Sequence, residues 1–563
     1  MVYGLLCLSH NTYQRSPFPR STAEIAEWIA PMSVSRSLIF SSLSRLLLLL
    51  CASNASAELQ LSPLFSDHAI LQRDRPISIW GWASPEQKIR VTLGQQSAEA
   101  TADFQGRWEV KLQPQAASSE GIDLQAEIIG SAEKIERRDI LFGDVWLCSG
   151  QSNMEWPLVL CDAPDDIASA KFPLIRHFGV EMNFASHPAN SVRGMWQIGS
   201  PDTAGGFTAV GFYFARKLHN ELKIPIGLVR SSVGGTNIEL WMSQETLLNT
   251  PQLEPYAAQM RASLDQYRED LKKALPAIEI WTKASREAMQ SDQPIPLPPP
   301  CPEFPFAERV ARPRCVTLHN GMIAPLIPNA FRGVIWYQGE NNAGDAASAK
   351  QYIEKKRALI EDWRRWFGSA DFPFYFVQLT SWQQPNNDPA GGDGWAIFRD
   401  AQRQALSIDQ TGMAVTTDLG DANDIHPKNK ADVGERLALW ALAKNYGQEI
   451  EYSGPLFKQV TIEGNRIRIH FDHVGKGLMV GEKIGRQPVK QSATNKLKRF
   501  AIAGQNRRWF WADATIDGDT VVCEHPDVPE PIAVRYAFSM NPEGANLYNR
   551  EGLPASPFRS DDF

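Results

Sequence analysis

A serine in a glycine-flanked turn is the first feature of this sequence that could do chemistry. Ser152 lies in the run GDVWLCSGQSNMEWP, directly after the short apolar segment 145–148. A serine hydroxyl can act as a nucleophile at a strand-to-helix turn, where a backbone N–H faces the oxyanion that develops on the substrate. Gly150 permits a tight turn and the close approach of a substrate. Taken alone, such a run is more often only a turn, so the case for Ser152 as a nucleophile depends on motifs further along the chain.

Three later motifs supply the groups that a serine nucleophile needs, and each follows an apolar, strand-like stretch. The motif VRSSVGG ends at the glycine pair Gly234 and Gly235. The motif VIWYQGENN ends with a side-chain amide at Asn342. The motif DLGDANDIHP carries His426 with carboxylates close by. A general base and neutral hydrogen-bond donors therefore follow the nucleophile along the chain.

These motifs resemble those of the SGNH hydrolase superfamily, and within it the sialate O-acetylesterase-like branch. The motifs GQSNM, WYQGENN and DIHP are specific in combination, and the C-terminal NLYNREGLPASPFRSDD is similar to the closing segment of that branch. The resemblance implies that Ser152 is the nucleophile and His426 the general base. It also implies an oxyanion hole formed by the Ser152 N–H, the Gly235 N–H and the Asn342 amide. The expected reaction is removal of O-acetyl groups from a carbohydrate through an acetyl-serine intermediate.

The third member of the catalytic triad is where this chain departs from the superfamily. An aspartate usually stands three residues before the histidine, but that position is Asn423 here, and Asp424 stands two before. In an extended segment such side chains lie on one side, about 6.5 Å apart. Asp424 can therefore reach His426 only if the loop bends. The sequence favours Asp424 as the orienting group and leaves Asp421 or a backbone carbonyl as alternatives.

Tryptophans close to these motifs bear on the substrate. Trp156, Trp241 and Trp336 could stack on sugar rings, although packing in the core is commoner for tryptophan beside strand ends. Arg399 could meet the carboxylate of a sialic acid or form a surface salt bridge. Sialic acid O-acetyl esters are the favoured substrate, with acetylxylan or another acetylated glycan as the alternative. A catalytically inactive glycan-binding protein is the non-enzymatic alternative.

The first 57 residues are typical of a leader rather than of a folded domain. The sequence predicts an irregular upstream extension over residues 1–31, and residues 32–57 carry a basic start, a leucine-rich stretch and small residues. This order predicts a signal peptide that is cleaved before Glu58, with export to the periplasm or the extracellular medium. The apolar stretch is short for a membrane span, so no stable membrane insertion is expected, and a retained anchor is the alternative.

Composition excludes several other classes of function. The net charge is −7, and the chain has no basic stripe, which argues against a nucleic-acid partner. The chain lacks CxxC and HxxxH motifs, so neither a metal nor another cofactor is expected. Five of the seven cysteines follow residue 57, and Cys301 with Cys315 could close a proline-rich loop. The oligomeric state is not fixed by the sequence.

The hydrophobic patterning predicts three successive regions after the leader. Residues 58–138 alternate as short strands, which indicates an N-terminal β-sandwich-like domain. Residues 139–446 alternate strands with helices, as expected for an SGNH-type, flavodoxin-like α/β domain whose mainly parallel sheet is sandwiched by helices. A polar and proline-rich insertion interrupts this domain at about 250–315. Residues 447–563 return to short strands and hairpin turns, which indicates a second β domain.

Overall fold

The computed structural model describes residues 58–305, 315–344 and 346–563. These residues belong to one compact unit, Ala57–Phe563. The predicted extension and signal peptide, residues 1–57, lie outside the described residues. Within the described ranges, no helix combines the length and the apolar character needed to cross a membrane.

The centre of the molecule is a mainly parallel sheet, as the alternation of strands and helices predicts. Its strand order is β10-β9-β11-β8-β12-β13-β14, and only the edge strand β10 is antiparallel to its neighbour. Strands β9, β10 and β11 lie on one side of β8, and strands β12, β13 and β14 lie on the other. The carboxyl end of β8 is therefore a topological switch point, where α/β proteins place their binding sites. The strands are β8 (Lys134–Gly150), β9 (Phe172–Gly179), β10 (Trp196–Gly199), β11 (Ile226–Ser232), β12 (Gly333–Tyr337), β13 (Phe374–Val377) and β14 (Thr411–Ala414).

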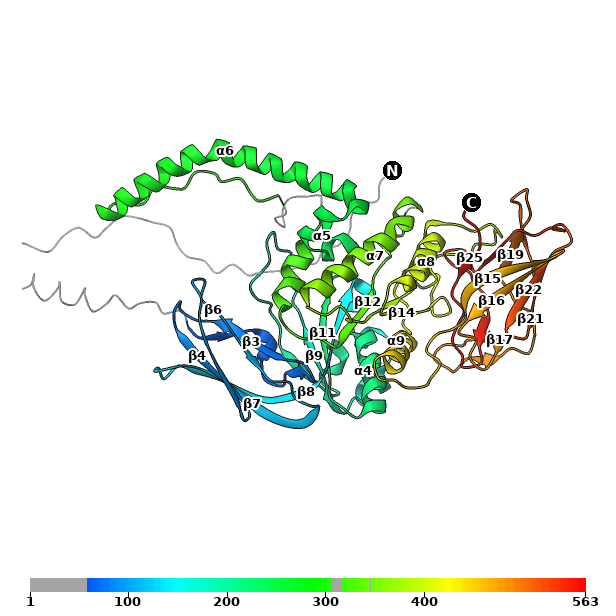
Figure 1. Ribbon diagram of the computed structural model, residues 1–563, viewed down its shortest axis with the longest axis horizontal. Helices are drawn as coiled ribbons and strands as arrows, with labels where there is room; N and C mark the ends of the chain where they lie inside the picture. The colour runs from blue at the N-terminus through cyan, green and yellow to red at the C-terminus, as the bar shows by residue number, and fades with distance from the viewer. Residues whose placement is uncertain (1–57, 306–314, 345) are drawn as a thin grey trace, which may run out of the picture. The chain divides into compact units, whose positions relative to one another are not determined.

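Helices cover both faces of this sheet (Figure 1). On one face lie α4 (Ala209–Leu222) and α9 (Lys430–Lys444), and on the other lie α7 (Ala346–Trp366) and α8 (Gly394–Gln404). Edge-to-face aromatic pairs join the layers: Trp146 of β8 packs on Phe214 of α4 with ring centroids 4.9 Å apart, and Trp336 of β12 packs on Trp363 of α7 at 5.7 Å. Such pairs bury large apolar areas and fix the helices against the strands.

The N-terminal strands continue into the central sheet through β8. The first half of β8 pairs with β7 (Ser118–Ile128) and β2 (Ile70–Gln72), whereas its second half forms the middle of the parallel sheet. The predicted boundary between residues 138 and 139 therefore falls inside one 17-residue strand. The other N-terminal strands are β1 (Gln60–Leu61), β3 (Ile77–Trp82), β4 (Lys88–Leu93), β5 (Gln96–Thr101) and β6 (Arg107–Leu112).

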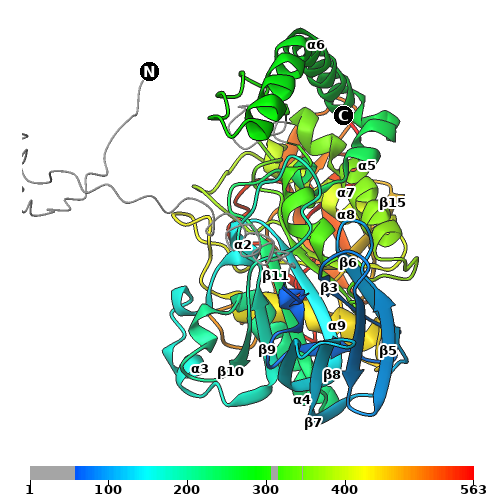
Figure 2. The ribbon, with the colours of Figure 1, turned by 90° about the vertical axis from the view of Figure 1, so that its left-hand side faces the viewer.

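The predicted insertion forms a long, mostly exposed helix. After α5 (Gln244–Asn249), helix α6 runs over Glu254–Gln290 and stands out in Figures 1 and 2. The proline-rich segment runs back along it, because the Trp281 indole N–H donates to the Pro296 carbonyl at 2.7 Å. Cys301 is an exposed free thiol, so the suggested Cys301–Cys315 bridge is not formed.

The C-terminal strands build sheets with a hydrophobic core of their own, which includes Ile467, Val521 and Phe558. Arg399 of α8 joins this region to the α/β sheet. Its guanidinium is fully buried and donates to the carbonyls of Leu379 and Thr380 on one side and of Ser539 and Met540 on the other. The strands are β15 (Leu456–Glu463), β16 (Arg466–Asp472), β17 (Leu478–Glu482), β18 (Lys490–Gln491), β19 (Phe500–Ala503), β20 (Trp509–Trp511), β21 (Asp513–Asp517), β22 (Thr520–Glu524), β23 (Ala533–Tyr536), β24 (Leu547–Asn549) and β25 (Phe558–Arg559).

Candidate active site

Ser152 lies at the carboxyl end of the central strand, as the GQSNM motif predicts. Strand β8 ends at Gly150, which is paired on both sides, with Ser232 of β11 and Tyr337 of β12. Gly150 has a φ of 131°, and a Cβ there would lie 2.1 Å from the Tyr337 carbonyl oxygen, so only glycine fits. The short helix α2 (Ser152–Glu155) begins immediately afterwards. Backbone pairing of β8 thus fixes the candidate nucleophile at the carboxyl end of the central strand.

His426 meets Ser152 directly, although 274 residues separate them in the chain. The His426 Nε2 atom lies 2.9 Å from the Ser152 Oγ, which is a hydrogen bond. The Trp156 ring stacks on the imidazole, with centroids 4.4 Å apart and an interplanar angle of 11°. Burial, with the Lys430 cation as the next cause, lowers the pKa of His426. The imidazole is therefore neutral at neutral pH and able to accept the serine proton.

The Asp424 carboxylate lies on the opposite side of the imidazole, and the loop bends there as the sequence requires. Its Oδ1 accepts a hydrogen bond from the His426 backbone N–H at 2.8 Å and stands 3.5 Å from the ring Nδ1. Asp421, the alternative, turns away and caps its own loop by accepting from the Asn423 N–H at 2.8 Å. Of the two carboxylates, only Asp424 contacts His426 within the described residues.

The glycine pair lies against the nucleophile. A Cβ on Gly234 would approach the Ser152 Cβ to 3.2 Å, and the Gly234 N–H already donates to the Glu155 carboxylate at 2.8 Å. Gly235 has a φ of 70° with open space beside its Cα. Its N–H has no hydrogen-bond partner in the parts of the chain that the structure describes. The geometry is compatible with donation from Gly235 to a substrate oxyanion.

The position of Asn342 does not fit the oxyanion role that the motif resemblance assigns to it. Asn342 is only 3% exposed, and its amide nitrogen donates to the Glu239 carboxylate at 3.2 Å. Its side-chain oxygen accepts from the Ile238 N–H and from the Gln338 amide. Asn342 is thus used within the protein, where it holds the segment that follows the glycine pair.

The neighbouring Asn341 lies beside the glycine pair. It is exposed, and its amide nitrogen lies 2.6 Å from the Gly235 carbonyl oxygen and 3.1 Å from the Asn237 Oδ1. Two adjacent asparagines carry no sequence signal that separates them, because the turn after β12 alone decides which side chain faces outward.

Three other candidate substrate residues lie inside the protein. Trp241 and Trp336 are fully buried and pack edge to face with centroids 6.2 Å apart, so neither stacks on a sugar. Arg399 binds four backbone carbonyls and reaches neither a substrate nor the surface, and burial lowers its pKa to about 9. Of Trp156, Trp241 and Trp336, only Trp156 reaches the Ser152–His426 pair, and its stacking partner is His426.

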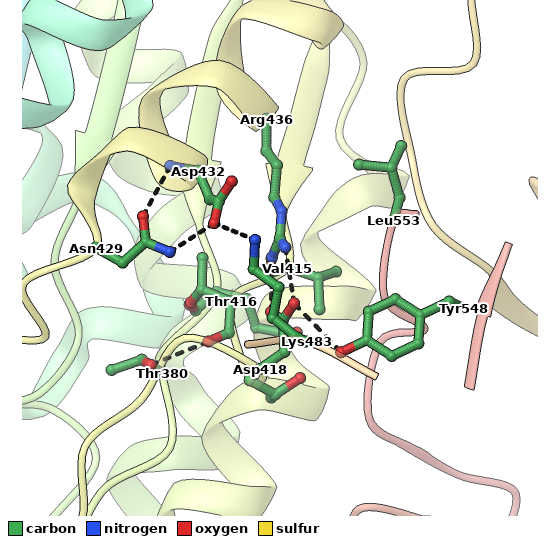
Figure 3. Close-up of polar contacts among 12 residues, drawn as sticks. Thr380, Val415, Thr416, Asp418, Asn429, Asp432, Arg436, Lys483, Tyr548 and Leu553 are labelled. Atoms are coloured by element: carbon green, nitrogen blue, oxygen red, sulfur yellow. Dashed lines mark hydrogen bonds and ion pairs between the residues drawn. The ribbon is translucent and has the colours of Figure 1, made fainter. Parts of the chain in front are cut away.

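Side chains anchor both ends of the loop that carries His426, and some come from the C-terminal strands (Figure 3). At the start of the loop, Asp418 binds Arg436 of α9 with two contacts of 2.7 Å, and Tyr548 of β24 donates to it. After the loop, Asp432 in the first turn of α9 pairs with Lys483 at 2.6 Å. The C-terminal region therefore contributes to the placement of His426.

No group of three or more histidine, cysteine, aspartate or glutamate side chains within the described ranges could hold a metal ion. The chemistry of the site, as far as the structure describes it, is that of a serine hydroxyl, an imidazole, a carboxylate and neutral amides.

Comparisons with known proteins identify the family of the chain. A family model described as carbohydrate esterase, sialic acid-specific acetylesterase, matches residues 142–292 and 314–443. Sialate O-acetylesterase from Mus musculus is 30% identical over 521 residues, covering 85% of this chain and 90% of the relative. The human enzyme is 28% identical over 531 residues, covering 85% and 88%. The crystal structure of a carbohydrate acetylesterase from Xanthomonas citri aligns with a TM-score of 0.73 and 35% identity, covering 90% of this chain and all of that one.

The fold, the site and these likenesses define a carboxylic ester hydrolase that deacetylates carbohydrate. Within that class, the chain belongs to the carbohydrate esterase family of sialic acid-specific acetylesterases.

Proposed function

We propose that this protein is a serine esterase that removes acetyl groups from sialic acid O-acetyl esters through an acetyl-serine intermediate. The observation that carries the proposal is the 2.9 Å contact between the Ser152 Oγ and the His426 Nε2 at the carboxyl end of β8. A neutral imidazole in that position can remove the hydroxyl proton as the oxygen attacks.

In the first half-reaction, the Ser152 oxygen attacks the acetyl carbonyl while its proton passes to the His426 Nε2. The N–H groups of Ser152 and Gly235 stabilise the oxyanion, and Asn341 contributes a side-chain amide once it leaves its contact with the Gly235 carbonyl. Asp424 stabilises the imidazolium from the Nδ1 side. Collapse breaks the bond to the sugar oxygen, which takes the proton from His426 and departs as an alcohol.

In the second half-reaction, water takes the place of the sugar. His426 removes a proton from the water as its oxygen attacks the acetyl-serine carbonyl. The same donors stabilise the second oxyanion, and Ser152 leaves with the proton that His426 returns. Acetate is released and the enzyme is restored.

A cation beside the catalytic residues supports an acidic sugar as the substrate. Lys428 follows His426 by two residues, its side chain is 44% exposed, and its Nζ lies 5.1 Å from the centroid of the Trp156 ring. The Lys428 Nζ lies 3.8 Å from the Asp424 Oδ2. Because an ammonium group has three N–H donors, it can also bind a second carboxylate. The carboxylate of a sialic acid would pair with such a group, whereas a neutral xylan chain would not.

The test is acetate release from O-acetylated sialic acids and from acetylated xylan oligosaccharides under the same conditions. We expect a higher kcat/KM for the sialic acid esters. We also expect Lys428→Ala to raise KM for these esters and to leave KM for the xylan esters unchanged. Lys272→Ala, an exposed lysine on the distant helix α6, is the matched control. Faster turnover of acetylated xylan, unaffected by Lys428→Ala, would identify the alternative substrate class. Turnover of neither class by folded protein would favour a glycan-binding protein.

A further inference from the structure

A buried polar cluster directly beneath Ser152 and His426 is not used in the reaction itself. It consists of Asn153, Glu340 and Lys430, which come from helix α2, the turn after β12 and the first residue of α9. Asn153 and Lys430 are fully buried. Burying a charged side chain costs free energy unless the side chain is paired or hydrogen-bonded. We therefore ask what these buried polar groups do.

Asn153 is the centre of the cluster. Its amide nitrogen donates to the Glu340 Oε1 at 2.6 Å and to the Ile425 carbonyl at 3.0 Å. Its side-chain oxygen accepts from the Lys430 Nζ at 2.5 Å. Every polar atom of this side chain therefore has a partner, one on the turn after β12 and two on the stretch that carries His426.

The hydrogen bonds of Asn153 connect the immediate neighbours of Ser152 and His426 in the sequence. Asn153 directly follows Ser152, and Ile425 directly precedes His426. A single amide thus ties the residue after the nucleophile to the residue before the base. Since the loop around His426 belongs to no strand, its position relative to Ser152 depends on side-chain contacts of this kind.

Lys430 adds a charge to the same geometry. Burial lowers its pKa to about 8, and the Cys161, Glu340 and Asp424 groups act in the opposite direction. Its Nζ also lies 5.5 Å from the centroid of the Tyr337 ring. The charged groups around the His426 ring are Lys430, Lys428 and Asp424; the two lysines disfavour the imidazolium and Asp424 favours it.

We propose that Asn153, Glu340 and Lys430 form a positioning network that fixes the His426 loop at hydrogen-bond distance from Ser152 and holds a positive charge near the imidazole. The proposal rests on the proposed function of Ser152 and His426. Asn153 supplies the link between the two catalytic residues, Lys430 supplies the charge, and Glu340 orients the Asn153 amide. None of the three touches the reacting atoms.

The first test separates position from packing. Asn153→Leu keeps the side-chain size but removes all three hydrogen bonds, so kcat should fall on the order of 10²-fold, because a displaced base loses its near-attack geometry. KM should change little. Glu340→Gln retains an acceptor for the Asn153 amide and should stay within about threefold of wild type. A normal kcat for folded Asn153→Leu would overturn the link between the two catalytic residues.

The second test measures the charge without relying on turnover. In a Ser152→Ala background, the titration of the His426 imidazole is followed by NMR. Lys430→Met should move the His426 pKa upward, because the cation that opposes protonation is gone. Lys430→Arg should leave it near its starting value, and Lys428→Met, which removes a more exposed cation, should shift it less.

An unchanged titration in Lys430→Met, or a larger shift in Lys428→Met, would overturn the role of Lys430. If Lys430→Met does not fold, the comparison of kcat between Asn153→Leu and Glu340→Gln still tests whether the network positions His426. Failure of the proposed function is seen separately, as full esterase activity in Ser152→Ala.

Discussion

The two proposed catalytic partners are held in place by different means. Ser152 follows β8, the strand that hydrogen-bonds to both β11 and β12, so the backbone of the sheet positions it. His426 lies on an irregular loop between β14 and α9, and side chains hold that loop: Asn153 at the Ile425 carbonyl, and Lys483 at the start of α9. The proposed nucleophile is placed by the fold, and the proposed base by a set of individual contacts.

Substitutions near the two residues should differ in how far they displace Ser152 and His426. A strand in the middle of a sheet keeps its position when one neighbouring side chain changes, because many backbone hydrogen bonds share the constraint. A loop held by a few polar contacts moves when one of them is lost, and a shift of about 1 Å at a catalytic group can cost 10²-fold in rate. Remote substitutions should therefore affect the histidine side of the site more than the serine side.

The largest effect is expected when either partner is removed. Ser152→Ala and His426→Ala should each lower kcat for an activated acetyl ester on the order of 10⁴-fold or more, because the two groups act as one unit. Both variants should retain the thermal unfolding midpoint of the wild type within a few degrees. Substantial activity in a folded Ser152→Ala protein, free of contaminating esterase, would exclude Ser152 as the nucleophile.

The next largest effect separates the two adjacent asparagines after β12. Asn341→Ala should lower kcat about 10²- to 10³-fold with little change in stability, as for a lost oxyanion donor. Asn342→Ala should instead reduce the free energy of unfolding by about 1–3 kcal/mol, because it leaves buried polar groups of Glu239 and Gln338 without their partner. Steady-state kinetics and chemical denaturation of both variants give the answer. The reverse pattern would return the oxyanion role to Asn342.

A smaller effect is expected from the orienting carboxylate. Asp424→Asn should lower kcat by more than about tenfold, because the imidazolium loses its charged partner. Asp424 raises the pKa of His426, so the acid limb of the kcat/KM profile should also move to lower pH in this variant. Asp421→Asn should behave as wild type, since Asp421 only caps its own loop. A large loss from Asp421→Asn alone would transfer the role to that residue.

The smallest effect tests whether the C-terminal region helps to hold the histidine. Lys483 is mostly buried and pairs with Asp432 at 2.6 Å, six residues after His426. Lys483→Met should lower kcat by no more than about tenfold, with KM unchanged, because α9 loses one anchor while Asn429 still caps it. Lys490→Met, on the exposed strand β18, is the matched control and should have no effect. An equal loss in both variants would contradict a specific anchor.

The sequence predicted the backbone-held side of the site better than the side held by contacts. The GQSNM motif is a local signal, because a turn that needs Gly150 follows directly from the strand before it. The choice between Asn341 and Asn342 depends on which way one turn faces, and the reach of Asp424 depends on a bend. Neither is encoded by spacing alone.

Much of the fold was also predictable, because the alternation of apolar strands and amphipathic helices is a strong local pattern. The mainly parallel sheet and the C-terminal strands appear where expected. Two features depend on tertiary packing and were missed: β8 continues from the N-terminal strands into the central sheet, and Arg399 is enclosed by carbonyls of two regions. A polar residue inside a buried helix carries no sequence signal that distinguishes it from one at the surface.

The proposed chemistry is tested most directly by identifying the covalent intermediate. An activated acetyl ester is mixed with the enzyme, and the reaction is quenched in acid within milliseconds. The peptide that contains Ser152 is then analysed by mass spectrometry. We predict one added acetyl group on Ser152, and accumulation of this species when Asp424→Asn slows its hydrolysis. An acetyl group on another residue, or active enzyme that forms no acetyl-enzyme under any quench condition, would contradict nucleophilic catalysis by Ser152.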